Sequence, residues 1–293
     1  DSSATALGGL TSLPRESWAN AREILVQTSE HNSTALAIVD SALFVLVLDE
    51  FVPANVHEAA ANMLHGTHAM SSIQSTANEL NSHAAKDSLA KEYQVGTCCN
   101  RWYDKLQIIV CSDGSAGVNF EHSAIDGHTA LRFVSDVYAE TVVTFAKSIT
   151  KSIYTSGCPI PTIIDAKLMR VALMAKQESD GNPLLDTSPK KLVFDVTEKM
   201  KNAIFYAETS LGDALHSDDT CVLEFQNFGK SLIVKNKLSP DSVVQMSILL
   251  GYYTLYGEIV CAYEPVLTKR FLHGRTEAMR STTSEVTELC AIW

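Results

Sequence analysis

No stretch of the sequence is apolar for long enough to cross a bilayer. The longest apolar run extends from Ala42 to Leu48 and is bounded by Asp40 and Asp49, whereas a membrane-spanning helix needs about 20 apolar residues. We therefore expect no transmembrane segment. A buried strand is the simplest interpretation of this run, although a buried helix has the same composition.

Paired cysteine motifs are also absent. The seven cysteines are an odd number, none forms a CxxC pair, and no histidine stands at zinc-finger spacing from a pair. This pattern favours a reduced, intracellular protein. The chain opens with Asp1, Ser2 and Ser3, so we expect no signal peptide.

Histidines gather in and before a polar region that spans residues 66–87, but they lack the neighbours that a metal site needs. The region is rich in Ser, Asn, His and Ala and is predicted to be a surface loop. No carboxylate or cysteine is grouped tightly with these histidines, so we expect exposed polar side chains and no metal site. The histidines concerned are His57, His65, His68 and His83.

Positive charge is scarce, and the formal net charge of −11 argues against nucleic acid as the main partner. An anionic ligand would need a local cluster of lysines. Lys230, Lys235 and Lys237 form such a cluster just before a helix start at Ser239 and Pro240. Ammonium groups and the free amides of a first helical turn suit phosphate. A solvated lysine loop is the alternative.

The chain of 293 residues, 46% apolar and 19% charged, can build a sizeable core in one large domain or two. Helices and strands interleave, so the class is α/β or α+β, with a lobe boundary near 187–189. We expect the first helix to be capped by Ser12 and the last by Ser239. The expected helices cover 13–27, 34 onward, 127–150, 165–176, 198–215 and 240 onward. The expected strands cover 106–111, 116–120, 192–196 and 220–228.

A histidine stands where a strand gives way to a helix. Asp113 and Gly114 form the turn of a predicted hairpin, and the sequence His122-x-x-x-Asp126-Gly127 follows it. An imidazole near neutral pKa can deprotonate a hydroxyl group, and Asp126 can fold back towards it or fix nearby structure. The motif predicts a general base for acyl transfer. A hydrogen-bonded structural histidine remains the alternative on spacing alone.

Several segments together resemble the carnitine/choline acyltransferase family, and the carnitine branch more than the choline branch. They follow the family's order over nearly the whole chain, and residues 100–134 are most similar to fungal-type carnitine acetyltransferases. The segments are Leu10-Thr11-Ser12 with Arg15 and Trp18-Ala19, Asn100 to Lys105, Asp113-Gly114 with Glu121-His122, Phe228-Gly229-Lys230 with Leu238 to Asp241, Tyr263-Glu264, and Gly274 to Glu277.

The resemblance implies the chloramphenicol acetyltransferase-like fold of CoA-dependent acyltransferases, with mixed sheets flanked by helices and an incomplete second lobe. Residues 1–188 would form an N-terminal catalytic lobe, and 189–293 part of a C-terminal lobe with the CoA- and carnitine-binding segments. The implied activity is reversible transfer of an acyl group, acetyl or short-chain, between CoA and the carnitine hydroxyl. His122 would be the general base, and no acyl-enzyme would form.

The resemblance also implies ligands for both substrates. Asp126 matches an acidic residue that positions the site through an arginine. Tyr263 and Thr276, whose hydroxyl groups can donate hydrogen bonds, match ligands of the carnitine carboxylate. The residues implied for CoA are Lys230, Lys235, Lys237 and Asp241. We expect CoA or acyl-CoA as co-substrate, no permanently bound cofactor, and a monomer in the mitochondrion, the peroxisome or the cytosol.

The chain departs from the family pattern in several places. Val234 stands where a lysine is found in carnitine acetyltransferases, and Pro265 replaces a serine. The chain has about half the family's length, and the segments that supply the arginine, the oxyanion hydroxyl and the acyl-length residue are missing. A fragment of a longer enzyme and a degraded paralogue both fit. The alternative function is a truncated, catalytically impaired member that only binds CoA or acts as an interaction module.

Overall fold

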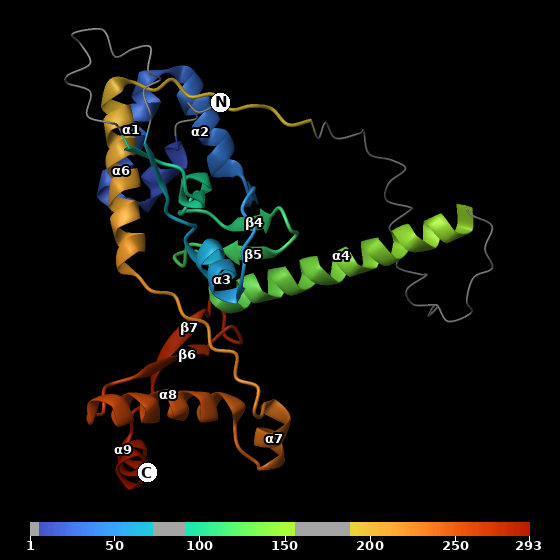
Figure 1. Cartoon of the computed structure of the whole chain (residues 1–293), viewed down its shortest axis with the longest axis vertical. Helices are drawn as coiled ribbons and strands as arrows, with labels where there is room; N and C mark the ends of the chain where they lie inside the picture. Colours follow the sequence, from blue (N-terminus) through green and yellow to red (C-terminus); the bar gives the residue numbers. More distant parts are fainter. Residues whose placement is uncertain (1–5, 73–91, 156–187) are drawn as a thin grey trace. The chain divides into compact units, whose positions relative to one another are not determined.

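The computed structural model describes residues 6–72, 92–155 and 188–293. The chain divides by its internal contacts into two units, unit 1 (Asp1–Thr220) and unit 2 (Cys221–Trp293). Both consist of helices with small sheets (Figure 1), so the expected mixed α/β class is confirmed. The predicted lobe boundary at 188/189 lies before α6 (Glu198–Ser217), which belongs to unit 1.

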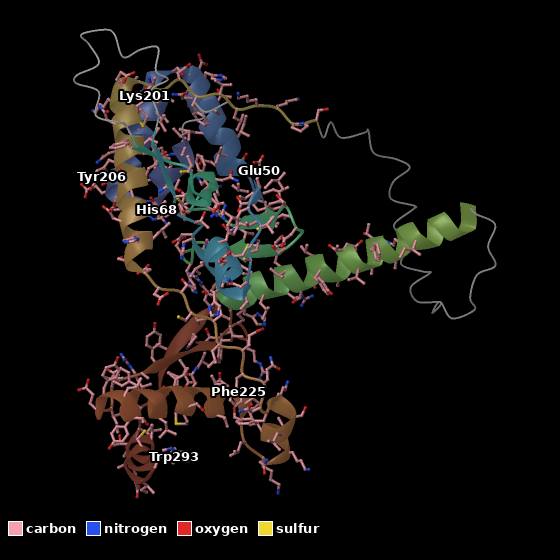
Figure 2. The ribbon with its side chains drawn as sticks, in the orientation of Figure 1. Glu50, His68, Lys201, Tyr206, Phe225 and Trp293 are labelled. Atoms are coloured by element: carbon pink, nitrogen blue, oxygen red, sulfur yellow. The ribbon has the colours of Figure 1, made fainter. Side chains whose placement is uncertain are left out.

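The hydrophobic core of unit 1 joins four helical segments that are distant in sequence. The 3-10 helix η1 (Leu7–Ser12) packs with α1 (Arg15–Thr28), α2 (Glu30–Ser41) and α6. In α1 the apolar residues recur at helical spacing, so one face is buried and the other is exposed. Figure 1 shows α6 beside α1, and Figure 2 shows Lys201 and Tyr206 on the exposed side of α6. The core residues are Leu7, Leu10, Trp18, Ala21, Leu25, Leu36, Met200, Ile204 and Ala207.

The starts of the first two helices differ from the sequence-based prediction. Ser12 does not cap α1, because its hydroxyl donates to the Gly9 carbonyl oxygen at 2.7 Å and so closes η1. Pro14 occupies the N-cap position of α1 instead. The second helix begins at Glu30 rather than near residue 34, because the Ser29 hydroxyl accepts a hydrogen bond from the Asn32 N–H.

Two predicted strands are wrong, and two predicted segments lie outside the described residues. Residues 192–196 form no strand. The N–H and the carbonyl oxygen of Asp195, which strand pairing would need, are both hydrogen-bonded to the side-chain amide of Asn32. Residues 220–228 also belong to none of the three sheets of the described chain, and Leu223 is 88% exposed. The predicted helix over 165–176 and most of the predicted loop over 66–87 lie outside the described residues.

The main sheet of unit 1 leads the chain to the candidate histidine. β1 (Val45–Asp49) pairs in parallel with β4 (Gln107–Cys111), which pairs antiparallel with β5 (Ala116–Asn119). The apolar run at 42–48 therefore contains a strand, which settles the choice between strand and helix. The predicted hairpin is confirmed at its turn, where Gly114 has a φ of 85° and the Asp113 carboxylate accepts from Ser115.

The described part of unit 1 also contains a second, smaller sheet, a 3-10 helix and two further α-helices. β2 (Met70–Ser72) pairs antiparallel with β3 (Glu92–Gln94), so part of the predicted surface loop is a short strand. The 3-10 helix η3 (Thr97–Asn100) follows β3. The helix α3 (Val56–Leu64) contacts β5, and α4 (Gly127–Thr155) follows the hairpin. The helix predicted over 127–150 is thus confirmed and extends further.

Unit 2 contains a helical segment and a hairpin. The short helix α7 (Lys230–Lys235) is followed by α8 (Pro240–Tyr256), whose predicted N-cap Ser239 is confirmed. β6 (Tyr263–Leu267) pairs antiparallel with β7 (Thr276–Arg280). The final helix α9 spans Ser284–Ile292 and contacts α8.

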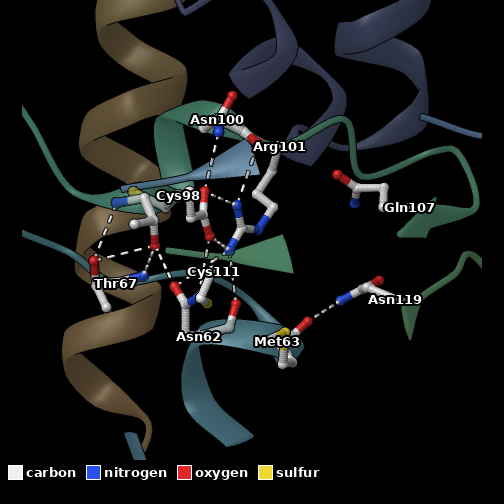
Figure 3. A network of polar contacts seen from close by, with 12 residues as sticks. Asn62, Met63, Thr67, Cys98, Asn100, Arg101, Gln107, Cys111 and Asn119 are labelled. Carbon is white, nitrogen blue, oxygen red and sulfur yellow. Dashed lines mark hydrogen bonds and ion pairs between the residues drawn. The ribbon is translucent and has the colours of Figure 1, made fainter. Parts of the chain in front are cut away.

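A buried ion pair between Arg101 and Asp49, the last residue of β1, connects the main sheet to neighbouring elements (Figure 3). Arg101 donates from both terminal nitrogens to the two carboxylate oxygens of Asp49, at 3.0 and 2.9 Å. Both side chains are almost completely buried, at 0% and 1% exposure. Removing two charges from water is costly unless further hydrogen bonds surround them. The ion pair therefore depends on the polar residues around it.

Asn62 and Asn100 supply the additional hydrogen bonds. Asn100 donates to one carboxylate oxygen of Asp49 at 3.0 Å, and Asn62 donates to the other at 3.1 Å. The carbonyl oxygen of Asn62 accepts from Arg101 at 2.8 Å. Burial raises the pKa of Asp49, but the hydrogen bonds from Arg101, Asn100 and Asn62 outweigh this effect and hold the pKa below its ordinary value. Asp49 thus remains ionised and links β1 to α3 and to the end of η3.

Breaking this ion pair should destabilise unit 1 strongly. Arg101→Met leaves the Asp49 charge buried without its partner, which we expect to cost about 3–5 kcal/mol of unfolding free energy. The measurement is urea unfolding followed by tryptophan fluorescence, since Trp18 and Trp102 lie in edge-to-face contact in this unit.

Lys201→Met is the matched control for that experiment. Lys201 forms an ion pair with Glu198, but both side chains are more than half exposed, so the loss should stay below about 1 kcal/mol. Equal losses for the two variants would contradict a special role for the buried ion pair.

Candidate active site

The candidate histidine lies between β5 and α4. The chain leaves β5 at Asn119, passes through a turn that contains His122, and enters α4 at Gly127. The side chain of His122 is 68% exposed, and its ring lies 5.9 Å from the Phe120 ring. This placement agrees with the expected strand–helix junction. An exposed imidazole at such a junction is accessible to a ligand.

Asp126 lies close to His122 and is buried. Its Oδ1 is 3.8 Å from Nδ1 of His122, while only 4% of its side chain is exposed. That distance is longer than a hydrogen bond, so these two atoms are close without being hydrogen-bonded to each other. The Asp126 carbonyl oxygen also accepts from the N–H groups of Thr129 and Ala130. The residue therefore begins α4 and faces the histidine at the same time.

The end of β5 is hydrogen-bonded to the end of α3. The side-chain amide of Asn119 donates to the carbonyl oxygens of Met63 and Leu64 at the end of α3, and Figure 3 shows Asn119 and Met63 joined in this way. Asn62, the preceding residue of α3, belongs to the buried network around Asp49. A continuous series of hydrogen-bonded groups thus connects the buried ion pair to the strand that precedes His122.

The predicted CoA residues lie together in unit 2, on one exposed segment. Lys230 and Lys235 are the first and last residues of α7, so the expected loop is partly helical. Lys237 follows with a φ of 62°, in the left-handed region. Asp241 lies in the first turn of α8, next to the cap that Ser239 forms. All four predicted residues are exposed.

The predicted carnitine residues lie on the hairpin of unit 2. Tyr263 is paired with Arg280, and Thr276 is paired with Leu267. Residues two apart on a strand share a face, so Tyr263 and Thr276 lie on the same face, separated by about 13 Å along the strands. Both are exposed. The loop between them needs Gly274, because a Cβ there would lie 1.8 Å from the Thr268 carbonyl oxygen.

The described structure thus collects the predicted residues in two groups. His122 and Asp126 belong to unit 1, and the CoA and carnitine residues belong to unit 2. Among the described residues, no group of three or more His, Cys, Asp or Glu side chains is arranged to hold a metal ion. Within the same residues, the helices are too short or too polar to span a bilayer.

The sequence does not reveal the polar groups that support the histidine. In the sequence Asp49 only bounds an apolar run, and Arg101 only belongs to a segment that resembles the family. A charged residue at the end of an apolar run is the available signal, because a charge that becomes buried requires a partner. Glu121 has no separate signal in the sequence, although it forms an ion pair with Arg15 at 3.1 Å.

Comparison with known proteins shows the family to which the chain is related. The model of the choline/carnitine O-acyltransferase family matches residues 1–293. The chain belongs to this family. The family resemblance expected from the sequence is therefore confirmed.

Two yeast relatives and one human relative illustrate the similarity. A putative mitochondrial carnitine O-acetyltransferase of Saccharomyces cerevisiae is 37% identical over 97% of the chain and 39% of its own length. A second carnitine O-acetyltransferase of that yeast is 30% identical over 99% of the chain and 32% of its own length. The mitochondrial carnitine O-palmitoyltransferase 2 of Homo sapiens is 30% identical over 97% of the chain and 34% of its own length. The chain thus spans between 32% and 39% of the length of these acyltransferases.

The cap of α8 can be tested separately from any activity. Ser239→Ala removes the oxygen that accepts from the Ser242 N–H, and we expect a loss of about 0.5–2 kcal/mol in the stability of the helix. Amide hydrogen exchange in the first turn of α8 should increase. Ser239→Asp keeps an acceptor and should restore the protection, whereas equal exchange in both variants would show that the cap contributes nothing.

Proposed function

We propose that the protein transfers an acyl group, acetyl or short-chain, reversibly between CoA and the hydroxyl of carnitine, with His122 as the general base. The observation that carries this proposal is the exposed imidazole of His122 at the end of the hairpin, with a buried carboxylate 3.8 Å away. Membership of the choline/carnitine O-acyltransferase family supports the reaction class. The relatives named as carnitine O-acetyltransferases support carnitine and the short acyl chain.

The chemistry needs a single base that works in both directions. His122 takes the proton from the carnitine hydroxyl, and the oxygen attacks the thioester carbonyl carbon. The tetrahedral intermediate then breaks its carbon–sulfur bond, and the CoA sulfur receives the proton from the imidazolium. The acyl group moves directly, so no acyl-enzyme forms. An imidazole suits this cycle because both of its protonation states are accessible near neutral pH.

Asp126 holds the site in shape rather than accepting the proton. Its buried carboxylate faces Nδ1 of His122 at 3.8 Å. Its carbonyl oxygen accepts from the first turn of α4, so the residue joins the turn around His122 to this helix. In the family resemblance, an acidic residue at this position acts through an arginine, and the segment that supplies that arginine lies outside this sequence.

Unit 2 supplies the substrate contacts in this proposal. Lys230, Lys235 and Lys237 bind the phosphate groups of CoA through their charges, and Asp241 closes the segment at the start of α8. The capped N-terminus of α8 adds a partial positive charge. Tyr263 and Thr276 donate hydrogen bonds from one face of the hairpin to the carnitine carboxylate.

The wider setting of the activity follows from the same resemblance. We propose a chloramphenicol acetyltransferase-like fold, with 1–188 as the catalytic lobe and 189–293 as part of the second lobe. CoA acts as co-substrate, with no permanently bound cofactor, and the protein works as a monomer inside the cell. Two of the relatives are named as mitochondrial proteins, so the mitochondrion is the first compartment to examine.

Replacing the base should abolish most of the turnover. In His122→Ala, we expect CoA release from acetyl-CoA in the presence of carnitine to fall by about 10²–10⁴-fold, the usual contribution of a general base. The assay follows the free thiol of CoA and the acetylcarnitine formed.

His128→Ala is the matched control, because His128 is an exposed histidine in the first turn of α4, six residues after His122. It should retain normal turnover. Full activity in His122→Ala would refute the assignment of the base. Binding of CoA without any transfer by the unaltered protein would instead favour a non-catalytic, CoA-binding member.

A further inference from the structure

Glu121, directly before His122, binds both Ser123, directly after the histidine, and Arg15 of α1. Its Oε2 accepts from the Ser123 N–H at 2.9 Å and also from the Ser123 hydroxyl. Its Oε1 lies 3.1 Å from Nη2 of Arg15. The side chain therefore spans His122 by binding the residue after it, and it joins this short turn to a different part of the chain.

The turn around His122 is closed by these hydrogen bonds. A carboxylate that accepts from the N–H two residues ahead restricts the backbone of the residue between them. The hydrogen bonds from the hydroxyl and the N–H of Ser123 hold the pKa of Glu121 below its ordinary value. The carboxylate is thus ionised at neutral pH, the form in which it accepts from both groups.

Arg15 connects this turn to the core of unit 1. It is the first residue of α1, whose Trp18, Ala21 and Leu25 are buried in the core. An exposed ion pair usually adds little to global stability. The Arg15–Glu121 contact differs from the pair of Arg132 and Asp136, which lie on one helical turn, because it joins a turn to an element from a distant part of the chain. Its consequence is a fixed position for the turn.

We infer that Glu121 is a positioning residue for His122, which it holds through Ser123 and anchors to α1 through Arg15. The inference rests on the proposed function, since it concerns the orientation of the general base. Reactive groups must be aligned closely with the substrate, and small displacements reduce the rate of the chemical step. Glu121 itself transfers no proton and contacts no reacting atom in this account.

Two variants separate the parts of this contact. Glu121→Ala removes every acceptor oxygen, whereas Glu121→Gln keeps one oxygen for Ser123 and loses the charge that pairs with Arg15. Glu16→Ala is the matched control, because Glu16 is an exposed glutamate next to Arg15 on α1. Thermal unfolding should change little in all three variants.

The first measurement requires no activity. Amide hydrogen exchange at Ser123 should accelerate by about tenfold in Glu121→Ala, change less in Glu121→Gln, and remain unchanged in Glu16→Ala. The NMR signals of the His122 ring should shift and broaden only in the Glu121 variants. Unchanged Ser123 exchange in Glu121→Ala overturns the inference, whether or not the protein shows turnover.

The second measurement is steady-state kinetics with acetyl-CoA and carnitine. In Glu121→Ala, kcat should fall by about 10–100-fold, while the KM values for both substrates stay nearly constant, and Glu121→Gln should recover only the part of the loss that belongs to the hydrogen bonds from Ser123. Normal kcat in Glu121→Ala, in a protein whose turnover is lost in His122→Ala, overturns the inference and leaves the proposed function intact. Normal turnover in His122→Ala refutes the proposed function, and the Ser123 exchange then still decides whether Glu121 orders the turn.

Discussion

The ion pair between Asp49 and Arg101 is the interaction on which the described part of unit 1 depends. It is buried, so it persists only because Asn62 and Asn100 complete the hydrogen bonding of the carboxylate. Through Asn62 it holds α3, and α3 in turn accepts from Asn119 at the end of β5. The strand that leads to His122 is therefore supported by a polar network rather than by apolar packing alone.

This arrangement explains how an exposed histidine can have a defined position. Surface turns are normally mobile, and a general base in such a turn would be poorly aligned with its substrate. Here the strand before His122 is held by the buried network, and the buried Asp126 directly precedes the helix after it and accepts from its first turn. Rigid elements on both sides leave only the short turn to be ordered. An exposed ring on a fixed backbone suits a base that meets two substrates.

Local signals in the sequence predicted the elements that carry the candidate site. The Asp113-Gly114 turn, the apolar stripe of α4 and the Ser239 cap each depend on residues close together in the chain, so their pattern is visible without the fold. The failed strands at 192–196 and 220–228 depended on pairing with distant segments, which no local pattern specifies. The ion pair of Asp49 and Arg101 also joins distant residues.

The central claim is direct acyl transfer between CoA and carnitine with a single histidine base. Initial rates measured while both substrates are varied test it most directly, because direct transfer requires both substrates on the protein at once. The account predicts intersecting double-reciprocal lines and no release of CoA from acetyl-CoA until carnitine is added. Parallel lines, with an early burst of free CoA in the absence of carnitine, would reveal an acyl-enzyme and contradict it.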